Sequence, residues 1–191
     1  MNIEITIGDI CEQPDMDAIV NAAKPELTGG GGVDGAVHKA AGPDLLKACL
    51  EVPLLGGDLG DQGWRIGRGH AHVTEAFELP NQWVIHTAGP IYKDDPNFAP
   101  AVLNACYRNS VVMGHAEGAR SIAFPAIGTG IYGYPLLQAT VIAVKSILDL
   151  PFGYFQDMET IRFVCFDEEN WLTYHRVLEG VQEGWKKVYT I

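Results

Sequence analysis

The chain has 191 residues, of which 47% are hydrophobic and 19% are charged, and its formal net charge is −11. This length and composition suit a soluble globular chain with a full core, so we expect a single domain over residues 1–191. The acidic balance argues against nucleic acid and anionic membranes as partners, because no cluster of lysine or arginine offsets the negative charge.

The first part of the chain combines two short strands with a run of glycines. Isoleucines at alternate positions over residues 3–7 predict a half-buried strand. Residues 17–21 predict a second strand, which leads into four consecutive glycines at 29–32. Helical character follows over 33–50, with a break expected at 42–43, where glycine precedes proline.

The rest of the chain continues the alternation of strands and helices. Residues 54–69 are rich in glycine and aspartate and predict an irregular loop. The alternation predicts a three-layer α/β/α fold with a mixed central sheet that is parallel at its centre. Further strands are expected over 70–77, 82–87, 121–127 and 160–166, and further helices over 97–117, 135–147 and 167–180.

Two glycine-rich loops, each between a strand and a helix, carry the predicted site. The glycines at 29–32 expose backbone N–H groups that can wrap an anion beside the positive end of a helix. Asp34 lies at that helix end, where a carboxylate weakens anion binding unless it takes part in chemistry or orientation. The second loop covers 128–133. Ligands bind at the carboxyl ends of strands in open α/β sheets, so both loops are expected to line one crevice suited to a diphosphate.

The second loop also matches the G-x-G-x-x-G pattern of dinucleotide-binding oxidoreductases. The match lies late in the chain, and Pro135 begins the next helix just after the last glycine instead of leaving that glycine packed inside the helix. The nearest downstream acid, Asp149, falls at the end of the helix rather than at the end of a following strand. These features argue against an oxidoreductase.

Five ordered segments carry a family resemblance. They read G-D-I at 8–10, D-A-I-V-N-A-A at 17–23, G-G-G-G-V-D-G-A-V-H-K-A-A-G-P at 29–43, H-T-A-G-P at 86–90 and F-P-A-I-G-T-G-I-Y-G-Y-P at 124–135. Together they resemble a macrodomain of the MacroD type, a class that includes the bacterial O-acetyl-ADP-ribose deacetylases. The similarity covers essentially the whole chain. It implies a macrodomain fold and ADP-ribose or O-acetyl-ADP-ribose as ligand, with no cofactor.

The resemblance also implies which residues bind the ligand. Asp9 matches the family's adenine-binding aspartate, whose carboxylate accepts from the exocyclic amine, and Ile10 is expected to add a backbone contact. The two glycine-rich loops match those that enclose the diphosphate and the distal ribose. They contribute Gly31, Gly32 and Val33 on one side, and Gly128, Thr129, Gly130, Ile131 and Tyr132 on the other.

For catalysis, the resemblance points to Asp34, which would orient or deprotonate a water that attacks an ester at the distal ribose. Asn21 matches an asparagine near that ribose, and Tyr132 is expected to pack against it. His38 lies one helical turn beyond Asp34 and could reach it, or serve helix packing. The implied activity is removal of acetyl from O-acetyl-ADP-ribose, or of an aspartate or glutamate side chain from mono-ADP-ribosylated proteins.

One residue departs from the family pattern. MacroD-type enzymes have asparagine ten residues before the aspartate, where this chain has Lys24. Lysine offers only donors on a long flexible stem, whereas asparagine also accepts. The ammonium could pair with Asp34, contact a phosphate or the ester carbonyl, or extend into solvent. We expect ADP-ribose binding to survive with hydrolysis slowed; the alternative is a non-catalytic ADP-ribose reader.

The remaining chemistry-bearing residues predict no second site. His70 and His72 share one face of a predicted strand, but no carboxylate or cysteine of suitable spacing joins them, so no metal site is expected. Trp64, Arg65 and Arg68 could flank the ligand cleft or cover the sheet edge. The cysteines form no C-x-x-C pair and, without a signal peptide, are expected as reduced core residues of a cytoplasmic protein: Cys11, Cys49, Cys106 and Cys165.

Overall fold

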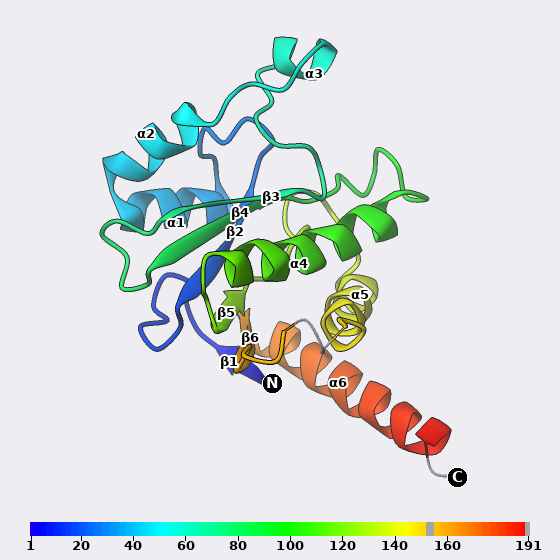
Figure 1. Ribbon diagram of the computed structural model, residues 1–191. Coiled ribbons are helices and arrows are strands. Elements are labelled where there is room, and N and C mark those ends of the chain that lie inside the picture. Colours follow the sequence, from blue (N-terminus) through cyan, green and yellow to red (C-terminus); the bar gives the residue numbers. More distant parts are fainter. Residues whose placement is uncertain (152–154, 190–191) are drawn as a thin grey trace.

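The strands form one six-stranded sheet in the order β1-β6-β5-β2-β4-β3 (Figure 1). The computed structural model describes residues 1–151 and 155–189, with side chains described as far as 181. Neighbouring strands from β1 to β4 in this order are parallel, and β3 runs antiparallel to β4 at the edge. The expected mixed sheet with a parallel centre is confirmed. The strands are β1 (Asn2–Ile7), β2 (Ala18–Ala23), β3 (Ala71–Glu75), β4 (Trp83–Ala88), β5 (Ser121–Phe124) and β6 (Thr160–Cys165).

Helices cover both faces of this sheet, which confirms the three layers (Figure 1). One face carries α1 (Gly32–Ala41) and α2 (Pro43–Glu51), and the other carries α4 (Ala99–Ala116), α5 (Leu136–Leu148) and α6 (Glu168–Tyr189). The break expected at 42–43 separates α1 from α2, where Gly42 has a φ of 78°. Of the described helices, none is long and apolar enough to cross a membrane.

Three segments differ from their expected structure. The strand expected over 121–127 ends at Phe124. The loop expected over 54–69 contains one short helix, α3 (Asp58–Asp61). The last helix was expected to end near Gly180 but continues to Tyr189. Gly180 and Gly184 each cost the helix only about 1 kcal/mol, and the glutamine, glutamate and lysine residues near them are good helix formers. The helix therefore runs through both glycines.

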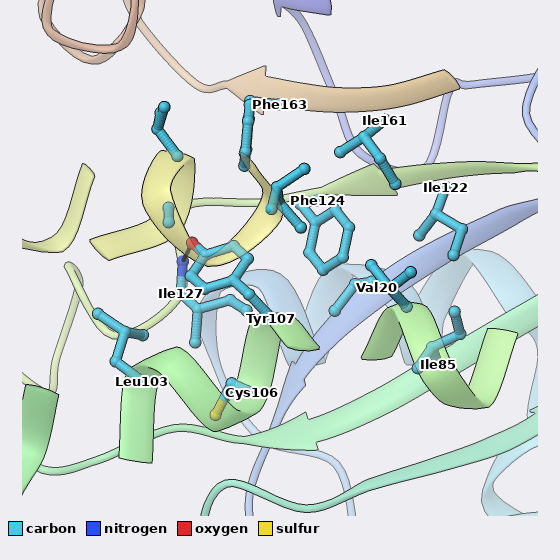
Figure 2. Close-up of a cluster of buried hydrophobic side chains, with 14 of the residues drawn as sticks. Val20, Ile85, Leu103, Cys106, Tyr107, Ile122, Phe124, Ile127, Ile161 and Phe163 are labelled. Atoms are coloured by element: carbon cyan, nitrogen blue, oxygen red, sulfur yellow. Dashed lines mark hydrogen bonds between the residues drawn. The ribbon is translucent and has the colours of Figure 1, made fainter. Parts of the chain in front are cut away.

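The larger part of the core lies between the sheet and α4, α5 and α6 (Figure 2). Its centre is aromatic: the Tyr107 and Phe124 ring centroids lie 5.3 Å apart, and Phe163 stands 6.2 Å from both. The backbone N–H of Ile127 donates to the Tyr107 hydroxyl at 3.4 Å. Because Ile127 begins the loop after β5, this buried tyrosine ties that loop to the core.

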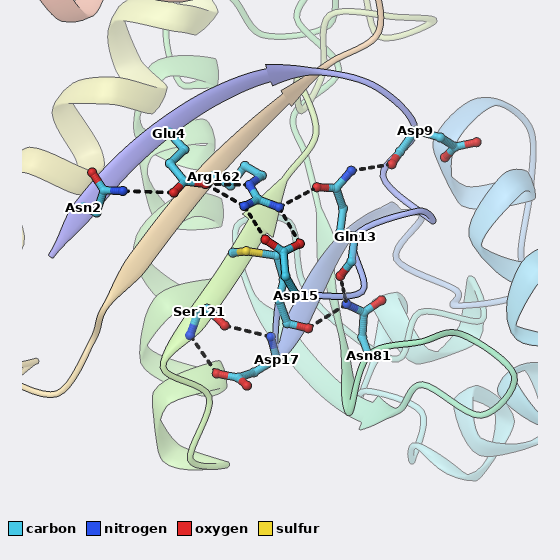
Figure 3. A network of polar contacts seen from close by, with 10 residues as sticks. Asn2, Glu4, Asp9, Gln13, Asp15, Asp17, Asn81, Ser121 and Arg162 are labelled. Atoms are coloured by element: carbon cyan, nitrogen blue, oxygen red, sulfur yellow. Dashed lines mark hydrogen bonds and ion pairs between the residues drawn. The ribbon is translucent and has the colours of Figure 1, made fainter.

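A polar network fixes the turn that follows β1 (Figure 3). Arg162 on β6 donates to both carboxylate oxygens of Asp15, at 2.8 and 2.6 Å, and to Glu4 and Gln13 at 2.8 and 3.0 Å. The Gln13 amide in turn donates to the backbone carbonyl of Asp9 at 2.7 Å. The hydrogen bonds from Arg162 hold the pKa of Asp15 below its usual range. The position of Asp9 thus depends on an arginine in another strand.

Candidate functional site

A cavity of about 300 Å³ opens at the carboxyl ends of the parallel strands. The end of β2, the first turn of α1 and the loop after β5 contribute most of its wall, so the structure brings the two glycine-rich loops together around one space. The wall consists of residues 22–24, 31–34, Gly89, 126–128 and 130–132.

Backbone conformation on both sides of the cavity depends on glycine. Gly32 at the start of α1 has a φ of 59°, and Gly128 in the opposing loop has a φ of 81°, values that residues with a Cβ rarely adopt. The N-cap of α1 is Gly31, and no described side chain caps this helix end. The first N–H groups of α1 therefore keep their hydrogen-bonding capacity for a ligand, beside the positive end of the helix dipole.

Asp34 is the buried carboxylate of the cavity wall, with 3% of its surface exposed. Its Oδ1 accepts from Asn21 Nδ2 at 2.8 Å and lies 3.5 Å from His38 Nε2. Its Oδ2 is shielded from solvent and has no hydrogen-bond partner among the described residues. Burial raises the pKa of Asp34, against the lowering effects of the Asn21 hydrogen bond and the charges of His38 and Lys24. One carboxylate oxygen is thus held by the protein, and the other has no hydrogen-bond partner among the described residues.

Lys24 reaches the cavity next to this carboxylate without forming an ion pair with it among the described contacts. Both side chains lie close to Gly30: a Cβ added to Gly30 would lie 2.8 Å from Lys24 Cε, 3.3 Å from Lys24 Nζ and 3.1 Å from Asp34 Oδ2. Lys24 is exposed. The sequence left open whether the ammonium pairs with Asp34, and the structure does not show that pairing.

Four expected site residues lie outside the wall of the cavity. Asn21 is fully buried and contacts Asp34 from beneath. Thr129 turns its hydroxyl to the Ala126 carbonyl, to which it donates at 3.0 Å. Asp9 and Ile10 stand at the end of β1, where Asp9 is exposed and accepts from the Cys11 N–H at 2.9 Å.

Arg68 lies at the site. From the sequence alone it could either flank the ligand cleft or cover the sheet edge. Its guanidinium lies 5.5 Å from the centroid of the Trp64 ring and 5.4 Å from that of Tyr132, and it donates to the Gly89 carbonyl at 2.6 Å. Tyr132 and Gly89 both line the cavity, so Arg68 connects two parts of its wall. No local pattern marks this contact, since Arg68 and Tyr132 belong to separate loops.

Phe166 is a second residue that sequence reasoning missed, because it was included in the predicted last strand. It directly follows β6, and its side chain is 90% exposed. The β1–β6 ladder pairs Ile7 with Cys165, so Phe166 leaves the sheet beside the turn that carries Asp9. An aromatic ring this exposed next to a carboxylate offers a stacking surface for a planar ligand.

The histidines at 70 and 72 do not lie on one strand. His72 lies on β3, whereas His70 precedes that strand. In the described part of the chain, no group of three or more histidine, cysteine, aspartate or glutamate side chains could hold a metal ion. All four cysteines are free, and three of them are buried.

Comparisons with known proteins agree with this architecture. The family model "Macro domain" matches residues 20–143. An O-acetyl-ADP-ribose deacetylase of Cronobacter sakazakii is 46% identical over 181 residues, which cover 95% of this chain and 96% of that protein. The deacetylase of Escherichia fergusonii is likewise 46% identical, over 95% of this chain and 97% of its own length.

Solved structures show the same similarity. An Oceanobacillus iheyensis macrodomain with ADP superposes with a TM-score of 0.85 at 38% identity, covering 95% of this chain and 92% of the other. A Trypanosoma brucei macrodomain in complex with ADP-ribose gives a TM-score of 0.78 at 35% identity, with 91% of this chain and 68% of that chain covered.

Proposed function

The chain belongs to the macrodomain family, and on that premise we propose that it binds ADP-ribose and hydrolyses esters at the distal ribose, with O-acetyl-ADP-ribose as substrate. Mono-ADP-ribosylated aspartate or glutamate side chains of proteins are a second substrate with the same ester bond. The four cysteines are free and mostly buried, which supports a reducing, cytoplasmic location.

The observation that carries the proposal is the free oxygen of Asp34 in the wall of an anion-binding cavity. Two glycine-rich loops offer backbone N–H groups for a diphosphate, in a chain whose net charge of −11 gives no overall attraction for anions. A buried carboxylate in such a wall opposes anion binding. Its retention there is explained if it acts on a water molecule at the distal ribose.

The reaction needs two proton transfers and the exchange of one bond. Asp34 Oδ2 orients a water and takes one of its protons while the water oxygen adds to the acetyl carbonyl carbon. The bond between that carbon and the ribose oxygen then breaks, Asp34 returns the proton to the ribose oxygen, and ADP-ribose is released together with acetic acid, which loses its remaining proton to solvent and becomes acetate. Backbone N–H groups near the helix end supply donors for the charge that develops on the carbonyl oxygen.

The adenine end of the ligand is assigned to the turn after β1. Asp9 would accept a hydrogen bond from the exocyclic amine, and the exposed ring of Phe166 would stack on the base. Ile10 lies next to Asp9 and would add a backbone contact. Gly31, Gly32, Val33, Gly128, Gly130 and Ile131 are assigned to the diphosphate and the distal ribose, with Thr129 contributing through its backbone and Tyr132 through its ring.

Lys24 supports a second candidate, a reader that binds ADP-ribose without turning it over, because lysine stands where the MacroD-type enzymes have asparagine. The structure favours the hydrolase, since Lys24 forms no ion pair with Asp34 among the described contacts and the carboxylate keeps a free oxygen. The curated relatives at 46% identity are named deacetylases, which favours the same choice.

Calorimetry with ADP-ribose and turnover of O-acetyl-ADP-ribose test the proposal on the whole chain. We expect saturable binding, measurable release of acetate, and a loss of at least about 100-fold in kcat for Asp34→Ala, the usual scale for a general base. Asp61→Ala, at an exposed aspartate of α3, is the control and keeps full activity. Binding without acetate release would establish the reader instead, and the absence of binding would exclude both.

A further inference from the structure

A row of buried polar side chains leads from Asp34 away from the cavity. Asn21 Nδ2 donates to Asp34 Oδ1 at 2.8 Å and lies 3.2 Å from His86 Nδ1. On the other side of the ring, His86 Nε2 lies 3.0 Å from Thr74 Oγ1. Asn21 and His86 are completely buried, and Thr74 is 7% exposed. The row crosses three neighbouring strands, β2, β4 and β3, and ends inside the protein.

The donors and acceptors of this row determine the tautomer of His86. The amide nitrogen of Asn21 can only donate, so the ring nitrogen facing it, Nδ1, must accept. The proton of the neutral ring is then on Nε2, from which it can be donated to the Thr74 hydroxyl. Cys49 Sγ, 3.8 Å from the same Nε2, is a weaker second acceptor.

The Asp34 carboxylate sets which way the Asn21 amide points, because an ionised carboxylate only accepts and the amide therefore turns its nitrogen toward it. Both amide protons are then used, one on Asp34 and one on His86, while the amide oxygen is buried with no partner among the described residues. In the reversed orientation the amide oxygen would face the carboxylate, and it would also face the lone pair of His86 Nδ1 for as long as the ring proton stays on Nε2. The Nε2-protonated tautomer of His86 therefore adds to the preference for the orientation in which the amide donates to Asp34.

From this geometry we propose that His86 is a positioning residue for ester hydrolysis: through Asn21 it keeps one oxygen of Asp34 bonded to the protein and the other free to act on water. The proposal rests on the proposed function, in which Asp34 is the base. His86 does not line the cavity, and its hydrogen-bonding path to Asp34 runs through Asn21.

The charge state of the ring supports this role. Burial lowers the pKa of His86 to about 3, and the neighbouring charges of His38 and His72 act in the same direction. The ring is thus neutral at all physiological pH values, and Nδ1 stays an acceptor. Burial also raises the pKa of the Cys49 thiol to about 12, so it stays protonated. The charged or titratable groups that face Asp34 and His86 are Lys24, His38, Cys49 and His72.

Nitrogen NMR of the labelled whole chain tests the tautomer without any assay of activity. We expect the His86 ring to show an unprotonated Nδ1 and a protonated Nε2, with no titration between about pH 5 and about pH 9. A protonated Nδ1, or a ring that titrates in that range, would overturn the proposal.

Thr74 offers a variant far from the ligand. Thr74→Val removes the hydroxyl that lies 3.0 Å from Nε2, so the tautomer that carries its proton there loses a hydrogen-bond partner and is stabilised less. We expect kcat for O-acetyl-ADP-ribose to fall about tenfold, on the scale of one lost hydrogen bond, with the affinity for ADP-ribose unchanged. The hydrogen bond from Asn21, which lowers the pKa of Asp34, is weakened in this variant. In a plot of kcat against pH, the fall of kcat on the acidic side should therefore begin at a higher pH. Thr74→Ser, which keeps the hydroxyl, should restore both.

Thr140→Val is the matched control, because Thr140 is also a buried threonine, and its hydroxyl donates to the Leu136 carbonyl at 2.9 Å outside the row. It should leave kcat and its pH profile unchanged. Equal effects of Thr74→Val and Thr140→Val would overturn the positioning role. If the natural chain binds ADP-ribose but releases no acetate, the proposed function fails while the tautomer measurement still decides whether His86 orients Asn21.

Discussion

At the scale of single residues, the site is a balance of charges around one buried carboxylate. Asp34 is held by Asn21 and approached by His38, whereas Lys24 reaches the same cavity without pairing with it. Asparagine at position 24 would provide a short group that both donates and accepts. The two changes that test this balance most directly are therefore at Lys24 and Asp34.

Lys24→Asn restores the residue type of the MacroD-type pattern. We expect kcat for O-acetyl-ADP-ribose to rise by about ten- to a hundredfold, the usual scale for one positioned donor, with a small change in ADP-ribose affinity. Steady-state turnover measures the effect. Lys145→Asn, at an exposed lysine of α5, makes the same change in net charge and should have no effect. Equal rates for the natural chain and Lys24→Asn would show that Lys24 does not impair the chemistry.

Asp34→Asn tests the cost of the buried carboxylate to folding. Because burial raises the pKa of Asp34 above its unfolded value, the ionised form is disfavoured in the folded chain. The protonated carboxyl favours folding at low pH, and this contribution is lost as the pH rises through the folded pKa. The neutral variant should therefore have the higher Tm at pH 7, with the difference shrinking as the pH falls toward about 4.

Scanning calorimetry at several pH values measures that difference, with Asp61→Asn as the control for net charge. A lower Tm for Asp34→Asn at neutral pH would mean that the contacts of the carboxylate outweigh its desolvation. Loss of activity together with a gain in stability is the usual relation for a buried catalytic group.

At the scale of elements, the glycine loop and α1 act as one unit through a close backbone contact. A Cβ added to Gly35, within α1, would lie 2.5 Å from the Gly30 carbonyl oxygen. The loop can therefore lie against the helix only if residue 35 has no side chain. This contact places the loop over the cavity.

Gly35→Ala has two opposing effects on the free energy of unfolding, a gain in helix propensity and a clash with the Gly30 carbonyl. Propensity alone favours alanine by about 1 kcal/mol, whereas overpacking of a rigid backbone costs about 1–3 kcal/mol. We expect a lower Tm and weaker ADP-ribose binding, measured by calorimetry. Gly56→Ala is the control, since an added Cβ there meets nothing within 4 Å. A higher Tm with unchanged binding would show that the loop shifts without cost.

The sequence predicted the order of elements well, because hydrophobic periodicity and the glycine–proline break at 42–43 are local signals. The contacts that it missed are not local. Arg68 meets Tyr132 across two loops, and Asn21 on β2 contacts both Asp34 on α1 and His86 on β4. Such contacts depend on how strands pair, and no spacing within one segment encodes them.

At the scale of the whole molecule, an acidic protein binds an anionic ligand. With a net charge of −11, the overall field repels ADP-ribose, and we expect the attraction to come from backbone N–H groups close to the ligand. Nucleic-acid-binding proteins differ in this respect, because their lysine and arginine side chains attract the ligand over long distances.

Salt dependence measures this difference. Added salt screens the repulsion between the acidic surface and the ligand more than the short contacts in the cavity. ADP-ribose affinity should therefore stay constant or increase when NaCl is raised from about 10 to about 150 mM, and calorimetry can follow it. A tenfold loss of affinity over the same range would indicate that exposed cations dominate binding.

The pairing of β1 with β6 has a consequence for biosynthesis. The ladder joins Asn2 to Thr160, so β1 finds its partner only after the four intervening strands, β2 to β5, have been translated. At about 5–20 residues per second, β1 waits on the order of ten seconds without its neighbour. The turn carrying Asp9 is fixed by Arg162 of the same late strand. A nascent chain that stops before β6 therefore exposes the edge of β5 to aggregation and lacks the support for Asp9.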